Sequence, residues 1–127
     1  PIMQRKVNIK SADRADSDRI LRDEIRRHLD RLPEGSEVML KLSIPAEPGL
    51  FQPLVDHPRV LRVVALSGGF SRSEACAELA KNPGMIASFS RALLSDLRHQ
   101  MSDEEFNSSL GQAIDEIHAA STEKVTV

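Results

Sequence analysis

Aromatic residues are scarce in this chain of 127 residues. It contains no tryptophan and no tyrosine, and its four phenylalanines make up 3% of the sequence. Proteins that bind single-stranded nucleic acids or carbohydrates commonly stack them on exposed aromatic rings. The net charge of −2 also lacks the positive excess that attracts nucleic acids. We therefore expect a small-molecule ligand and no nucleic-acid partner.

Cysteine and long apolar runs are equally scarce. Cys76 is the only cysteine, so an internal disulfide is excluded, and a packed thiol in a reducing compartment is expected. No run approaches the ~20 apolar residues that a membrane-spanning helix needs, and the first residues lack an apolar signal core. These absences predict a cytoplasmic protein without a membrane partner.

The chain length suits one domain covering residues 1–127, with a loose tail at 121–127. Strands are expected at 1–9, 38–45, 62–66 and 85–89, and helices at about 20–32, 71–80, 90–98 and 102–120, with a short helical or irregular piece at 48–55. Capping boxes, Ser71 with Glu74 and Ser102 with Glu105, mark the starts of two of these helices. Such alternation predicts an α/β fold with parallel strands and right-handed crossovers.

The strand at 38–45 carries one cation in an apolar stretch. Side chains alternate between the two faces of a strand, so Leu40 and Leu42 share one face and Lys41 lies on the other. A partly desolvated lysine amine can act as a nucleophile that forms a Schiff base with a carbonyl. The plainer alternative is a lysine that extends its ammonium to the rim of an ordinary strand.

Two further groups follow the last two strands. Ser67, Gly68 and Gly69 join a buried strand to a capped helix, where free backbone N–H groups can bind an anion. Arg91 follows the next strand and begins a helix, where a guanidinium can clamp a phosphate. The plainer alternatives are a tight strand-to-helix turn for the glycines and a surface charge for Arg91. Neighbouring parallel strands end at the same edge, so we expect these residues to share one phosphate.

Three motifs occur in the order found in one family. VMLKLSIP at 38–45, RVVALSGGFSR at 62–72 and ASFSRAL at 87–93 resemble the C-terminal half of bacterial class I fructose-bisphosphate aldolase, as do residues 105–107 and 114–121. The resemblance covers residues 1–121. It implies half of a (β/α)8 TIM barrel, with four parallel strands and their helices.

The resemblance also implies a function. Lys41 matches the Schiff-base lysine, Ser67, Gly68 and Gly69 match the phosphate loop, and Arg91 matches the phosphate-binding arginine. The implied reaction is the glycolytic cleavage of fructose 1,6-bisphosphate into glyceraldehyde 3-phosphate and dihydroxyacetone phosphate. No cofactor and no metal are expected, because the protonated imine accepts the electrons.

The chain departs from the family in two respects. Gln4, Arg5 and Lys6 occupy the positions of a Glu-Pro-Glu motif that supplies the acid-base carboxylate, so proton transfer is impaired. A barrel of this kind typically has ~250 residues, so four strands leave two open edges and an uncovered inner face. We expect self-association or a complementary N-terminal half as partner, besides the sugar phosphate.

Two function classes remain open at this stage. The chain is either the lysine-bearing half of an aldolase, inactive or weak alone, or a non-catalytic remnant that binds sugar phosphates or acts as an interaction module.

Overall fold

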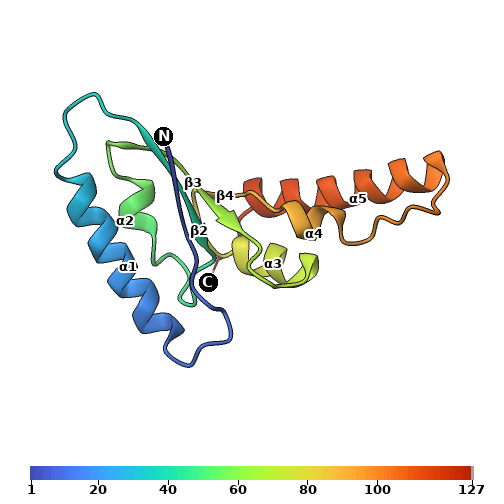
Figure 1. Cartoon of the computed structure of the whole chain (residues 1–127), viewed down its shortest axis with the longest axis horizontal. Helices are drawn as coiled ribbons and strands as arrows, with labels where there is room; N and C mark the ends of the chain where they lie inside the picture. The colour runs from blue at the N-terminus through green and yellow to red at the C-terminus, as the bar shows by residue number, and fades with distance from the viewer. Residues whose placement is uncertain (127) are drawn as a thin grey trace.

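The computed structural model describes residues 1–126 and contains one sheet of four parallel strands (Figure 1). The strands are β1 (Ile2–Arg5), β2 (Val38–Ser43), β3 (Val60–Leu66) and β4 (Met85–Ala87), and they lie in sequence order. The helices are α1 (Arg14–Leu29), α2 (Gln52–Val55), α3 (Arg72–Leu79), α4 (Ser90–Leu94) and α5 (Asp103–Thr122). The predicted α/β class with a parallel sheet is confirmed.

One face of the sheet forms the core. Leu40 and Leu42 in β2 and Val63 and Ala65 in β3 are buried at 0–1% exposure. They pack with buried residues from the helices, namely Ile25, Leu29, Leu54, Ala75, Cys76, Leu79 and Ala120. Each fully buried leucine or valine side chain stabilises the fold by roughly 1.5–3 kcal/mol. The helices and this face therefore form two layers around a single apolar core.

The opposite face of the sheet carries a row of mixed side chains. In the strand register, Gln4 pairs with Lys41, Lys41 with Val64, and Val64 with Ile86. Lys41 alternates with the buried Leu40 and Leu42, so it lies on the face opposite the helices, as the sequence predicts.

The first strand is shorter than expected, because a side chain captures the backbone beyond it. β1 ends at Arg5, whereas the sequence suggested a strand at 1–9. The Val7 N–H donates to Ser43 Oγ at 2.8 Å, and Ser43 Oγ donates to the Val7 carbonyl at 3.3 Å. The backbone of Val7 thus bonds a side chain instead of a neighbouring strand, and residues 6–13 become a loop over the C-terminal end of β2.

Helix α3 begins as the sequence predicts. Ser71 Oγ accepts the Glu74 N–H, and the Glu74 carboxylate accepts the Ser71 N–H, which completes the capping box. Cys76 lies on the buried side of α3 as a free thiol, and burial together with nearby Glu116 raises its pKa to about 11. The expectation of a packed thiol is confirmed.

The segment after β3 and α3 differs from the sequence expectation at two boundaries. β4 ends at Ala87 and not at residue 89, because Phe89 turns into the core as the N-cap of α4. α4 ends at Leu94 and not at residue 98. At α5, Ser102 Oγ accepts the Glu105 N–H at 3.1 Å, but among the described residues the Glu105 carboxylate does not accept the Ser102 N–H, so only half of the predicted capping box forms.

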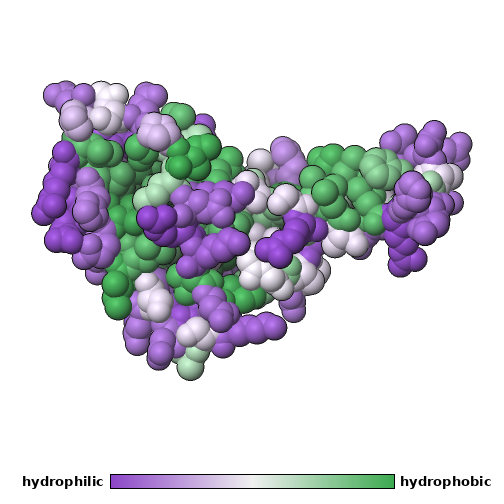
Figure 2. Space-filling view, in the orientation of Figure 1, coloured by the Kyte–Doolittle hydropathy of each residue, from purple (hydrophilic) through white to green (hydrophobic). Residues whose placement is uncertain are grey.

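Helix α5 extends away from the sheet (Figure 1). Phe106 and Ile114 on α5 are 39% and 48% exposed, and Leu94 on α4 is 51% exposed. Figure 2 shows apolar surface along the projecting part of α5. No helix within residues 1–126 combines the length and apolarity needed to cross a membrane.

The segment expected to be a loose tail, 121–127, makes specific contacts at residues 121–125. α5 continues to Thr122, and the Val125 N–H donates to the Ala80 carbonyl at 2.9 Å. Lys124 Nζ donates to the carbonyls of Leu79, Met85 and Ala120 at 3.2, 2.7 and 2.8 Å. These bonds satisfy a partly buried ammonium, whose pKa is lowered by burial. Val127 lies outside the described residues.

The same tail covers one edge of the sheet, where the sequence suggested two open edges. The Ser88 N–H donates to Ala65 in β3, so the preceding N–H, that of Ala87, points away from β3. The Ala87 N–H donates to Ser121 Oγ at 2.9 Å, and the Met85 carbonyl accepts from Lys124. Ser121 and Lys124 therefore form hydrogen bonds with the main-chain groups of β4 that point away from β3.

We predict that Ser121→Ala destabilises the protein by about 1 kcal/mol, because the Ala87 N–H at the β4 edge loses its acceptor. The free energy of unfolding, measured in urea, reports the change. Ser108→Ala is the matched control, since Ser108 lies exposed on the same helix. Equal losses for both variants would show that the Ser121 hydroxyl does not stabilise the edge.

Candidate anion-binding site

The turn after β3 exposes backbone N–H groups at the C-terminal edge of the sheet. The Phe70 N–H donates to the Ser67 carbonyl at 3.1 Å, and the two residues between them, Gly68 and Gly69, have φ angles of 63° and 98°. Such left-handed backbone favours glycine, because a side chain there is sterically strained. The two glycines therefore make this tight turn possible, as the plainer interpretation of the sequence requires.

Two adjoining hollows surround this turn. The larger, about 380 Å³, is lined by Lys6, Val7, Asn8, Ser43, Leu66, Gly68, Gly69 and Arg91. The smaller, about 190 Å³, is lined by Ser67, Gly69, Phe70, Ser71, Arg72, Arg91, Ala92 and Ser95. The four residues that the sequence suggested for phosphate binding thus line two neighbouring hollows, of which Gly69 and Arg91 line both.

The larger hollow is positively charged. Its lining includes the cations Lys6 and Arg91 and no carboxylate. Among residues 1–126, neither cation has a carboxylate oxygen within 4.0 Å. By contrast, Arg72 forms ion pairs with Asp96 and Glu116, and its hydrogen bonds to these carboxylates raise its pKa. Lys6 and Arg91 remain available for an anion from solution.

Lys41 lies on the same side of the sheet but deeper along β2. It is partly exposed and does not line either hollow. Ser43, two residues further along the same face, lines the larger hollow, and two residues of a strand span roughly 6.6 Å. Lys41 therefore lies on the same face of β2 as a residue that lines the larger hollow, two residues before it.

The sequence interpretation did not assign Lys6, Asn8 and Ser43 to the site. Ser43 could have been found, because it shares the face of Lys41. The position of Lys6 depends on the loop after β1, which Ser43 holds at Val7. The Ile9 side chain also lies against the turn, 3.7 Å from where a Cβ on Gly68 would stand. These contacts are between residues distant in sequence, which no local pattern reveals.

A buried polar group connects α1 to the site. The Asp18 side chain is fully buried, and its Oδ2 accepts the Ala46 N–H at 2.8 Å. Arg14 donates to the Ile44 carbonyl at 2.8 Å, and its guanidinium lies 5.5 Å from the centre of the Phe70 ring. Arg14 and Asp18 together fix the start of α1 against the end of β2 and the turn after β3.

The Asp18 carboxyl is under-satisfied in this position. Its Oδ1 has no hydrogen-bond partner among the described residues, and burial raises the pKa of the carboxyl, opposed by the Ala46 N–H and the charge of Arg14. A raised folded-state pKa means that ionisation opposes folding. The contribution of Asp18 to stability is therefore greatest below its unfolded pKa and decreases as the pH rises through the folded value.

We predict that Asp18→Asn removes this pH dependence. The difference in free energy of unfolding between variant and wild type should shift in favour of the variant as the pH rises above the ordinary aspartate range, near 4. Urea titrations at several pH values measure it, with exposed Asp13→Asn on the same helix end as control. If the difference in free energy of unfolding between Asp18→Asn and wild type stays constant with pH, the raised pKa of Asp18 is contradicted.

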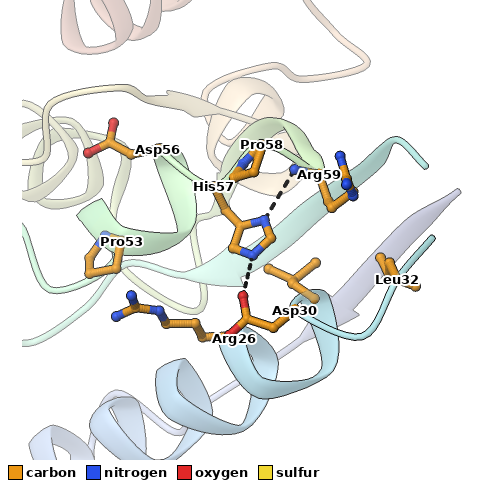
Figure 3. A pocket seen from close by; sticks show the side chains of 9 residues that line it. Arg26, Asp30, Leu32, Pro53, Asp56, His57, Pro58 and Arg59 are labelled. Carbon is orange, nitrogen blue, oxygen red and sulfur yellow. Dashed lines mark hydrogen bonds and ion pairs between the residues drawn. The ribbon is translucent and has the colours of Figure 1, made fainter. Parts of the chain in front are cut away.

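A third hollow, of about 450 Å³, lies at the opposite end of the sheet (Figure 3). His57 there contacts Asp30, with 2.8 Å between Nε2 and Oδ1, and His57 Nδ1 accepts the Arg59 N–H at 3.1 Å. Because Nδ1 accepts, Nε2 carries the proton and donates to Asp30. Neither ring nitrogen is free to act as a base. The pair joins α1 to the segment before β3 and has a structural role.

No group of three or more His, Cys, Asp or Glu side chains within residues 1–126 is arranged to hold a metal ion. No model of a known protein family matches the chain.

Proposed function

We propose that the chain is the lysine-bearing, phosphate-binding half of a class I fructose-bisphosphate aldolase. The observation that carries the proposal is the shared hollow of Gly68, Gly69 and Arg91 at the C-terminal ends of β3 and β4. Backbone N–H groups and a guanidinium from neighbouring parallel strands form a common phosphate site, and in (β/α)8 barrels this site frequently follows the last two strands.

The sheet supports a half-barrel interpretation. Its four parallel strands lie in sequence order, and the core side chains on one face pack against the helices. A (β/α)8 barrel contains eight such strand–helix units around a closed ring. The row containing Gln4, Lys41, Val64 and Ile86 would then face the barrel interior.

The proposed chemistry uses the Lys41 amine. The neutral amine adds to the carbonyl carbon of a ketose phosphate, and loss of water together with uptake of one proton from solvent gives a protonated imine. When the adjacent carbon–carbon bond breaks, its electron pair moves to the imine nitrogen, while a base takes the proton of the neighbouring hydroxyl. Gln4, the register partner of Lys41 in β1, cannot take that proton.

A second polypeptide would have to supply the missing base and close the site. β1 is an edge strand, and the Lys41 row on its sheet is not covered by the helices. A complementary N-terminal half, or a second copy, would add strands at this edge and cover the inner face. The chain alone is therefore expected to show little or no turnover, since proton transfer typically contributes ~10² to 10⁴ in rate.

We predict that dihydroxyacetone phosphate and borohydride label Lys41 covalently. Reduction fixes the imine, and peptide mass spectrometry locates the adduct. Lys41→Met should abolish this label, whereas Lys10→Met, an exposed lysine, should leave it unchanged. Equal labelling of surface lysines would refute a special Lys41. Robust turnover by the pure chain, without a complementary half, would refute the need for a partner.

We also predict that Arg91→Ala weakens the binding of glycerol 3-phosphate by roughly 1.5–3 kcal/mol, because a charge-assisted hydrogen bond is lost. Isothermal titration calorimetry measures the affinity. Arg98→Ala is the control, an exposed arginine beyond α4 that lines neither hollow. Unchanged affinity in Arg91→Ala would remove the phosphate assignment.

A non-catalytic sugar-phosphate-binding protein is the second candidate. The observation favouring it is the absence of a carboxylate from the lining of both hollows, with Lys6 in the larger one. Failure of Lys41 to form a reducible imine, together with phosphate binding that depends on Arg91, would select this candidate.

A further inference from the structure

The second cation of the larger hollow, Lys6, has no role in the function proposed above. It comes from the loop after β1, whereas Arg91 comes from the first turn of α4, so the two charges reach the hollow from different segments of the chain. The loop is held in place, because Val7 bonds Ser43 in both directions and Ile9 packs against Gly68 and Gly69. The backbone on either side of the hollow is thus fixed, and the exposed Lys6 side chain lines the hollow from this loop.

Lys6 and Arg91 differ in which of the two hollows they line. Arg91 and Gly69 line both hollows, while Lys6 lines only the larger one. A phosphate bound between Gly69 and Arg91 therefore leaves room on the side of Lys6. With about 380 Å³, the larger hollow falls within the size range of small-molecule sites. The geometry suits a ligand with two separate anionic groups.

Of the other polar groups near Lys6, the Ser43 hydroxyl and the Asn8 side-chain carbonyl are engaged within the chain, whereas the Asn8 amide NH2 group is a neutral donor without a partner among the described residues. The Ser43 hydroxyl donates to the Val7 carbonyl and accepts the Val7 N–H. The side-chain carbonyl of Asn8 accepts the Lys10 N–H at 2.9 Å. The remaining charge on this side of the hollow is the single ammonium of Lys6. A carboxylate, with one negative charge, matches this single ammonium more closely than a second phosphate, which carries about 1.5 to 2 negative charges at pH 7.

We propose that the hollow binds a small phosphorylated carboxylic acid, with its phosphate at Gly69 and Arg91 and its carboxylate at Lys6. The proposal rests on the phosphate site of the proposed function and adds the class of ligand. It requires no reaction at Lys41. This ligand class differs from the fructose 1,6-bisphosphate of the proposed function, because its second anionic group is a carboxylate and not a phosphate.

Two three-carbon probes isolate the carboxylate. Glycerol 3-phosphate and 3-phosphoglycerate have the same length and the same phosphate, but only the second carries a carboxylate. Calorimetry at low ionic strength, where exposed charges are least screened, compares their affinities. The variants are Lys6→Gln, Arg91→Gln and the control Lys10→Gln, which removes the same charge from the same loop outside the hollow. Far-UV circular dichroism and thermal unfolding verify that each variant folds.

We expect the wild type to bind 3-phosphoglycerate about tenfold more tightly than glycerol 3-phosphate, as one charge-assisted contact allows. Lys6→Gln should abolish this preference and change glycerol 3-phosphate binding less than about twofold. Lys10→Gln should leave both affinities unchanged, and Arg91→Gln should weaken both.

Five outcomes would overturn the proposal. If Lys6→Gln still prefers 3-phosphoglycerate over glycerol 3-phosphate, the carboxylate binds elsewhere. If Lys10→Gln loses this preference as fully as Lys6→Gln, the preference depends only on the net charge of the loop. Equal weakening of both probes by Lys6→Gln would make Lys6 part of the phosphate site. If the wild type binds both probes equally, the carboxylate subsite alone is wrong, whereas binding of neither probe means that the phosphate site of the proposed function is wrong as well.

Discussion

The burial of one face of β2 is the constraint on which the rest of the structure depends. Leu40 and Leu42 are at most 1% exposed in the core, and the alternation of a strand then sends Lys41 and Ser43 to the opposite face. Shifting the strand by one residue would bury the lysine and expose the leucines, so the register is strongly fixed. Ser43 in turn holds the Val7 backbone, and this bond places the loop after β1 over the end of the sheet.

The candidate site follows from this arrangement and from the parallel direction of the strands. Parallel neighbours end at the same edge, which brings the turn after β3 and the start of α4 together, so that Gly69 and Arg91 line the same depression. Arg72 begins α3 beside this turn, yet Asp96 and Glu116 neutralise it. Local ion pairing, more than the number of basic residues, therefore determines where the positive charge is available in a chain of net charge −2.

The sequence was sufficient for elements whose signals are local and insufficient where distant groups compete for the backbone. The alternation in β2 and the reciprocal caps of Ser71 and Glu74 act within a few residues, and both are observed. β1 ends early because Ser43, 36 residues away from Val7, captures the backbone there. The C-terminal segment lies against the sheet edge because the Lys124 ammonium donates to the carbonyls of Leu79 and Met85, 45 and 39 residues away. The same reason explains why Lys6 was not assigned to the anion site.

The two edges of the sheet differ in what they can offer another strand. At β4, the Ala87 N–H and the Met85 carbonyl are already bonded by Ser121 and Lys124, so a strand arriving there must first displace these side chains. β1 is the other edge strand, four residues long, and is paired with β2 on one side. Within residues 1–126, the outward Gln4 carbonyl at β1 accepts only from the exposed Arg5 side chain, at 2.8 Å. An arriving strand displaces that side chain more easily than the partly buried Ser121 and Lys124, so addition of a partner at β1 costs less free energy than addition at β4. Closing a barrel through both β1 and β4 would break the bonds that Ser121 and Lys124 make at β4. New strand pairing at β4 would have to replace them.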